Sequence, residues 1–133
     1  MTSPSIELRG AIHAHLRADV GLADLIEGIY DRVPKGALFP YLTYGEVSLS
    51  PNDASCITAN EHVFDIHVWD RQVGSVRAEN VAHLVKARLH RNRLDLSQHA
   101  AHEIIYRNIR KVADEDGLTT HVVVSFGCYV QEL

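Results

Sequence analysis

Histidine is the residue type in this chain that could most readily do chemistry, because the 133-residue sequence contains nine of them. An imidazole can bind a transition metal or transfer a proton near neutral pH. Two ligands of one metal must lie on the same face of an element. His99 and His102 have the one spacing that could chelate, and no third ligand is evident beside them. We therefore expect surface or interface histidines, and no metal site.

Spacing separates the other histidine pairs. His13 and His15 are two residues apart on a predicted helix, so their side chains point in nearly opposite directions. His62 and His67 differ by an odd number on a predicted strand, which puts them on opposite faces. The predicted solvent side of a second helix carries Glu79, His83, Lys86 and His90.

Nucleophilic catalysis has no recognisable motif in the sequence. There is no G-x-S-x-G elbow, no H-E-x-x-H pair and no glycine-rich phosphate loop. The two cysteines do not form a disulfide framework: Cys56 falls in a polar segment and Cys128 in an apolar strand. Asp65 and His67 share a strand face, where hydrogen bonds to neighbouring strands are the expected role. We expect no enzyme and no cofactor.

The overall charge disfavours a dedicated nucleic-acid binder. The formal net charge is −4 and the pI is about 6.1, whereas such binders neutralise phosphates with Lys and Arg. The most basic stretch, 86–93, is expected to complement a helix dipole and cover apolar surface. Contact with an acidic neighbouring subunit or with DNA is the alternative for that stretch.

The composition fits one globular domain spanning residues 1–133, with 46% apolar and 23% charged residues. The first residues lack a basic region followed by an apolar stretch, so no export signal is expected. We therefore expect synthesis in a reducing cytoplasm.

Hydrophobic periodicity predicts the elements that position these side chains, with an apolar stripe on two helices and on the final strand. The stripes are Leu8, Ile12 and Leu16 in a first helix, Ala78, Val81, Ala82, Val85 and Leu89 in a second helix, and Val122, Val124, Phe126, Cys128 and Val130 in the final strand. A hydroxyl N-cap and a proline open a helix at Ser3 and Pro4 that runs to about Asp19, followed by one more short turn. The segment 50–60 is rich in Pro, Asn, Asp and Ser and is predicted to be a loop. The order α-β-β-β-α-β-β predicts an α+β fold with two helices on a mainly antiparallel sheet. The other predicted elements are strands at 29–33, 41–49, 63–70, 102–112 and 118–131, a helix at 75–90 and a turn at 114–117.

Trp69 lies on the opposite strand face from Phe64, Ile66 and Val68. Both faces of that strand are therefore apolar in part, and helices can cover one of them. We expect a partner chain or a folded-over hairpin on the other face, which favours self-association.

Two segments resemble a known family. The stretches 29–36 (IYDRVPKG) and 39–46 (FPYLTYGE), and then 62–69 (HVFDIHVW) followed by Asp70, Arg71 and Gly74, are similar to the tail completion (tail terminator) proteins of long-tailed phages and gene transfer agents. The resemblance extends over essentially the whole chain. Its motifs are structural, and none is a catalytic fingerprint.

The resemblance implies a structural virion protein that forms a homohexameric ring at the head-proximal end of the tail tube. Such a ring ends tube polymerisation and joins tail to head. The implied partners are other copies of the chain, the tail tube protein and a head–tail connector. DNA would pass through the ring without specific binding, and the ring would lie in the neck of the tail after assembly in the bacterial host cytoplasm. The residues we expect at its contacts are Ser50, Asn52, Asp53, Cys56, Ile57, Asn60 and Trp69.

Two other functions stay open at this point. One is a small oligomeric α+β protein that binds a metabolite or a metal through its histidines. The other is a different ring of the head–tail connector, which the same residues would serve. An infectious phage, a prophage and a gene transfer agent would all be expected to carry the motifs of this family.

Overall fold

The computed structural model describes residues 3–52 and 58–132. Helices α1 (Pro4–Arg17) and α2 (Val20–Ala23) come first, and strands β1 (Gly28–Tyr30), β2 (Tyr41–Pro51) and β3 (Ala59–Asp70) follow. Helix α3 (Val76–Leu89) then leads into β4 (His99–Ala113) and β5 (Thr120–Glu132). The α+β class is confirmed, with a short third helix in place of the single turn that the sequence predicted after the first helix.

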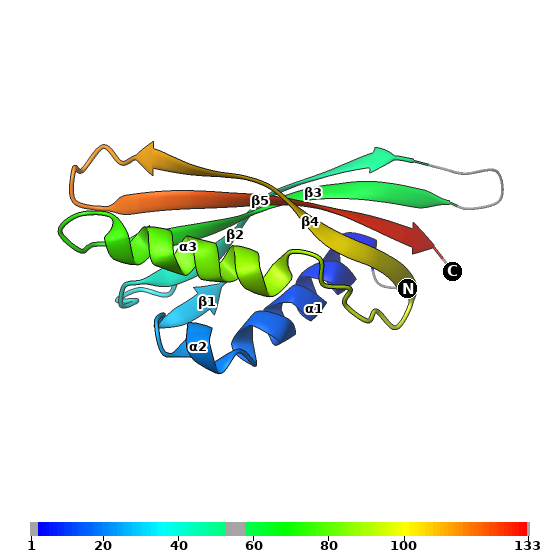
Figure 1. Ribbon diagram of the computed structural model, residues 1–133, viewed down its shortest axis with the longest axis horizontal. Coiled ribbons are helices and arrows are strands. Elements are labelled where there is room, and N and C mark those ends of the chain that lie inside the picture. The colour runs from blue at the N-terminus through cyan, green and yellow to red at the C-terminus, as the bar shows by residue number, and fades with distance from the viewer. Residues whose placement is uncertain (1–2, 53–57, 133) are drawn as a thin grey trace.

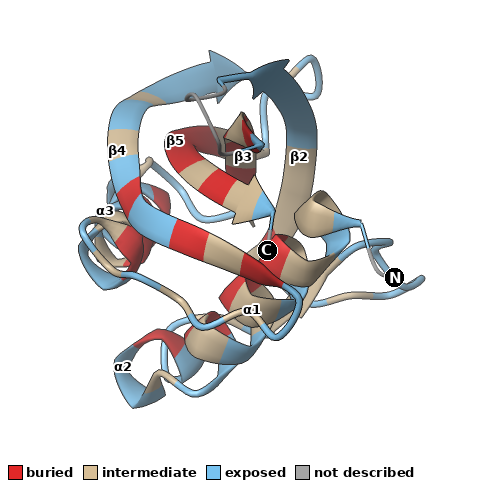
Figure 2. Ribbon diagram, turned by 90° about the vertical axis from the view of Figure 1, so that its right-hand side faces the viewer, coloured by how far each residue is buried: buried red, intermediate tan, exposed pale blue. Residues whose placement is uncertain are grey.

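One five-stranded sheet in the order β1-β2-β3-β5-β4 organises the fold. Strand β1 is parallel to β2, and every other neighbouring pair is antiparallel. All the helices lie on one side of this strongly twisted sheet (Figures 1 and 2). The long strand β5 therefore lies between the long strands β3 and β4.

The core lies between the helices and the sheet. The predicted apolar stripes of α1, α3 and β5 are all buried, as the sequence indicated. Side chains from both helices interlock with the inner faces of β3 and β5, and this burial supplies the main stabilisation. The core includes Leu8, Ile12, Leu16, Ala78, Val81, Ala82, Val85, Leu89, Val122, Val124, Phe126, Cys128 and Val130.

Local chemistry sets the helix boundaries near the N-terminus. Pro4 occupies the first turn of α1, as predicted, but the Ser3 hydroxyl makes no capping bond to the helix. The first helix ends at Arg17 and not at Asp19, because the Asp19 carboxylate caps α2 by accepting from the Leu22 amide at 2.8 Å. That hydrogen bond is the main reason that the pKa of Asp19 is lowered.

Several strand boundaries differ from the prediction. The first strand is shorter and ends at Tyr30, before the turn around Pro34. The segment predicted as a loop from 50 to 60 begins and ends in strand, because Pro51 pairs with Asn60 and extends the β2–β3 hairpin. His99 and His102 lie within β4 and not before it.

The end of α3 also differs from the prediction. Lys86 and His90 were expected to face away from the protein, but both lie against β4. The Lys86 ammonium lies 4.1 Å from the centre of the Tyr106 ring, and His90 Nδ1 accepts from the Tyr106 amide at 3.0 Å. Beyond the helix, Arg91 has a φ of 64°, and the Arg91 amide donates to the Ile104 carbonyl at 2.7 Å. The chain after α3 therefore covers part of the open edge of β4.

Candidate functional site

The sheet face opposite the helices carries a stack of aromatic rings. The Trp69 ring stacks on the His121 ring with centroids 3.7 Å apart, and His121 stacks on His67 at 4.7 Å. His67 Nδ1 and His121 Nε2 share a hydrogen bond of 2.5 Å, and Trp69 Nε1 donates to the Thr43 hydroxyl at 2.9 Å. Because Trp69 and His121 are register partners, β3 and β5 position this stack.

The two stacked histidines favour their neutral forms. Burial lowers the pKa of His67, and burial followed by repulsion from His67 lowers the pKa of His121. The nearby carboxylates of Asp65 and Glu46 oppose the shift at His67 without reversing it. A neutral pair can keep one N–H donor facing one ring nitrogen acceptor.

Ionic contacts cover the rest of this sheet face. Asp65 on β3 accepts from the Ser125 hydroxyl on β5 and from Arg110 Nη2 on β4 at 3.4 Å. Glu61 on β3 and Arg107 on β4 form a second pair at 3.3 Å. Each pair reaches across β5 above a small residue, Ser125 or Gly127. Side chains of the same chain therefore cover much of the sheet face on which Trp69 lies.

The remaining histidines have separate surroundings. His13 Nδ1 lies 2.6 Å from the Tyr44 hydroxyl, and His15 Nε2 donates to the Arg88 carbonyl at 2.8 Å. His62 and His99 are buried, and burial lowers the pKa of His62. His102, three residues from His99, is exposed while His99 is buried, so the two histidines whose spacing could have allowed chelation point apart. Among residues 3–52 and 58–132, no three His, Cys, Asp or Glu side chains gather closely enough to hold a metal ion.

The residues predicted at assembly contacts do not form one patch. Ser50 and Asn52 are exposed near the end of β2, and Asn60 is half-buried at the start of β3. Trp69 lies nine positions further along β3, about 30 Å away at the usual rise of a strand. Asp53, Cys56 and Ile57 lie outside the described residues.

The sequence reasoning missed an exposed apolar surface at the opposite end of the sheet. The connections 31–40, 71–75 and 114–119 lie together there (Figure 1), and we call this surface the loop end. Leu38, Val73 and Leu118 come from these connections and expose between 66% and 102% of their surface. Isolated exposed apolar residues are ordinary, but several on adjoining loops make this surface a candidate for contacts with a partner.

Arg71 holds the three connections of the loop end together. Its Nε donates to the Thr119 hydroxyl at 3.0 Å, and its Nη2 lies 3.5 Å from the Asp116 carboxylate. The same guanidinium lies 5.0 Å from the centre of the Phe39 ring. Next to Arg71, the buried Asp70 accepts two hydrogen bonds from Arg77 and so fixes the start of α3. The exposed side chains therefore project from a fixed base.

An open groove of about 520 Å³ lies at the other end of β4 and β5. We call it the β4 groove. Ile105, Arg107 and Tyr129 lie along it, and Arg93 from the segment after α3 lies at its side. Arg93 has no ion-pair partner among the described residues, whereas Arg107 pairs with Glu61. The basic stretch 86–93 thus divides into cations that pack on the chain, such as Lys86, and cations that remain available.

The Asp114–Gly117 segment forms the predicted turn. The Asp116 carboxylate accepts from the Leu118 and Thr119 amides at 2.7 and 2.8 Å. Hydrogen bonds from Thr119 lower the pKa of Asp116 to about 2.

The described residues contain no helix that is long and apolar enough to span a membrane.

Solved structures share this fold. A chain from the "Virion of native gene transfer agent (GTA) particle" superposes with a TM-score of 0.89 and 23% identity, over 98% of this chain and 99% of that chain. The gp17 protein of bacteriophage SPP1 superposes with a TM-score of 0.61 and 20% identity, over 93% of this chain and 88% of that chain. Comparison with curated protein sequences returns no match. The profile of the family described as "Tail completion protein gp17" matches residues 10–131, so the chain belongs to the family of tail completion proteins.

Proposed function

We propose that this protein is a structural, non-enzymatic subunit of a phage-type tail that forms a ring of six copies at the head-proximal end of the tail tube. The ring ends tube polymerisation and presents a surface to the head–tail connector. The family match over residues 10–131 carries this proposal. The fold shared along nearly the whole chain with a chain of a gene transfer agent virion supports it.

The surface chemistry fits a protein that acts by binding. The loop end presents exposed aliphatic side chains on connections that Arg71 holds in place. A preorganised apolar patch loses little conformational freedom on binding, which favours assembly. The binding partners in this proposal are other copies of the chain, the tube protein and the connector.

The net charge suits a ring through which DNA passes. With a net charge of −4 per chain, six copies would carry about −24, which disfavours adhesion of a polyanion. DNA would then cross the ring without specific binding. The neck of the tail is the proposed location, and assembly would take place in the cytoplasm of the bacterial host.

Deletion of the gene tests this function directly. Negative-stain microscopy of particles made without the protein should show overlong tails, or filled heads separated from tails. Expression of the chain from a plasmid should restore normal particles, which controls for effects on neighbouring genes. Particles of normal length and normal head attachment in the deletion strain would rule the proposal out.

The same images separate the terminator from a neighbouring connector ring. Loss of a terminator leaves tube growth unchecked, so the length distribution of the tails broadens upward. Loss of a connector ring leaves tails of normal length that fail to join heads. A metal- or metabolite-binding protein would produce neither change, and zinc would raise its melting temperature.

A further inference from the structure

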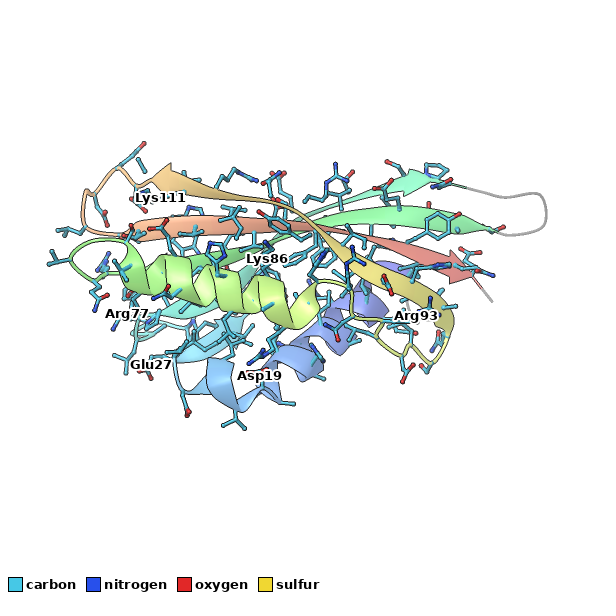
Figure 3. All side chains as sticks on the ribbon, viewed as in Figure 1. Asp19, Glu27, Arg77, Lys86, Arg93 and Lys111 are labelled. Atoms are coloured by element: carbon cyan, nitrogen blue, oxygen red, sulfur yellow. The ribbon has the colours of Figure 1, made fainter. Side chains whose placement is uncertain are left out.

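We propose that residues 114–118, the tip of the β4–β5 hairpin, dock into the β4 groove of a second copy of the chain. This inference rests on the proposed function, because it names the contact by which the copies would close a ring. The two surfaces lie at opposite ends of the same hairpin. Figure 3 shows Lys111, close to the tip, and Arg93, beside the groove, at the two ends of the sheet.

Hydrogen bonds fix the hairpin tip, and two of its side chains, Glu115 and Leu118, are exposed. Asp116 binds the backbone of the tip internally, and Arg71 holds Asp116 from outside. Glu115 is exposed and has no ion-pair partner among the described residues. Leu118 exposes 69% of its surface beside it. Asp114 is half-buried and accepts from the Asp116 amide at 3.2 Å, so the tip presents Glu115 as its exposed carboxylate and Leu118 as its apolar side chain.

The β4 groove presents the complementary pair. Arg93 has no ion-pair partner in the described part of the chain, and Ile105 exposes 45% of its surface. Arg107 is already neutralised by Glu61 at 3.3 Å. Glu103 also lines the groove, and it forms no ion pair with Arg93 in the described part of the chain. Arg93 is thus the cation left to receive Glu115, with Ile105 placed to contact Leu118.

The open edge of β4 favours a docked tip over an added strand. The Ile104 carbonyl accepts from the Arg91 amide, the Ile104 amide donates to the Asn92 carbonyl, and His90 accepts from the Tyr106 amide. The pairing of β4 with β5 also shifts register twice, after Ala101 and after Tyr106. Occupied backbone groups and bulges obstruct strand addition at a sheet edge. Beside the groove, between Ile104 and Tyr106, these features favour side-chain contacts of a second copy over strand addition.

The contact is heterologous, because the tip and the groove are different surfaces of one chain. Repetition of such a contact generates a closed ring when the rotation per copy divides a full turn. One tip and one groove per copy leave no unmatched surface in the closed ring. This property fits a second copy better than the tube protein as the occupant.

A charge swap tests the contact in particles. Plasmids carrying Arg93→Glu, Glu115→Arg or both substitutions would complement the deletion strain. Each single variant should reduce the number of normal-length, joined particles by about tenfold or more, the usual scale for loss of an ion pair repeated around an interface. The double variant should restore the count to near the wild-type level. Asp24→Arg, a charge reversal at an exposed residue away from both surfaces, should have no effect.

Each result distinguishes this contact from the proposed function. Normal particles from both single variants would overturn the contact while leaving the terminator function intact. Defective singles without rescue by the double variant would overturn it as well, and would assign the two residues to the tube or the connector. Circular dichroism and thermal melts of the purified variants control for folding. Failure of the deletion phenotype itself would instead remove the proposed function.

Discussion

At the scale of single residues, His67 and His121 show that histidines of this chain contribute hydrogen bonds and ring stacking to the fold. They share a hydrogen bond of 2.5 Å on the outer sheet face and stack with Trp69. Burial lowers the pKa of both rings. The folded protein therefore favours the neutral form of both rings, and protonation of either ring destabilises the folded state.

This pair predicts a loss of stability in mild acid. A histidine whose pKa is lower in the folded than in the unfolded chain binds more protons when unfolded. Its contribution is fully present above the unfolded pKa of about 6.5 and decreases as the pH falls below that value. The free energy of unfolding, measured in urea, should therefore be smaller at about pH 5.5 than at about pH 7.5.

The variant His121→Gln isolates the contribution of the pair. It should lose less stability than the wild type between the two pH values, because the ring of His121, whose pKa is lowered by burial and by repulsion from His67, is gone. His83→Gln is the matched control, since His83 is exposed on α3 and has no hydrogen-bond partner in the described part of the chain. An equal loss in His121→Gln and in the wild type would contradict this origin of the pH dependence.

At the scale of elements, β2 bends where it meets this cluster. The pairing of β2 with β3 shifts register between Tyr44 and Val47, opposite Asp65. Gly45 lies in the shifted segment, and a Cβ there would stand 2.2 Å from His67 Nε2 and 2.9 Å from Asp65 Cβ. The missing side chain of Gly45 thus provides the space for the His67 ring.

Gly45→Ala should therefore destabilise the protein by about 1–3 kcal/mol, the usual cost of overpacking. Gly10→Ala is its matched control, because Gly10 is exposed on α1 and has no atom within 4 Å of an added Cβ. There alanine should stabilise by about 0.5–1 kcal/mol through helix propensity. Urea unfolding of both variants measures the opposite signs, and a neutral Gly45→Ala would show that the cluster can shift at no cost.

Hydrophobic periodicity correctly predicted which side chains are buried in the helices and strands that bury only one face. The stripes of α1 and α3 and the inner face of β5 all lie in the core. It could not predict that Val123 and Ser125, on the outer face of β5, are buried too. Their cover comes from Asp65 and Arg110 on the two flanking strands, and the register that aligns these strands is not local in the sequence.

The candidate contact surfaces were less predictable for the same reason. Leu38, Val73 and Leu118 each stand alone in a polar connection, and only the fold brings the three connections together. The direction of Lys86 was predicted wrongly because the helical period alone does not reveal that β4 curves toward the end of α3. The predicted contact residues from Ser50 to Asn60 and Trp69 stay a prediction.

At the scale of the whole molecule, the hairpin tip and the β4 groove define a direction. Both lie on the β4–β5 hairpin, whose β4 strand runs from His99 to Ala113. The groove residue Ile105 and the tip residue Glu115 are ten positions apart, which is about 33 Å at the usual rise per residue. Copies joined tip to groove would then lie with this hairpin along the circumference of the ring, so the separation of tip and groove sets the size of the ring.

Six copies in this arrangement predict a ring with a circumference of roughly 200 Å and a mean diameter of roughly 65 Å, from the strand rise alone. Class averages of the isolated neck viewed along the tail axis would measure it. The Arg93→Glu and Glu115→Arg double variant should give the same diameter as the wild type, because the swapped pair restores the same contact. A mean diameter near half this value would mean that the hairpins point along the tail axis or toward the lumen. In that case the hairpin tip would face the tube or the DNA passage, and the tip-to-groove contact would be wrong even if the ring has six copies.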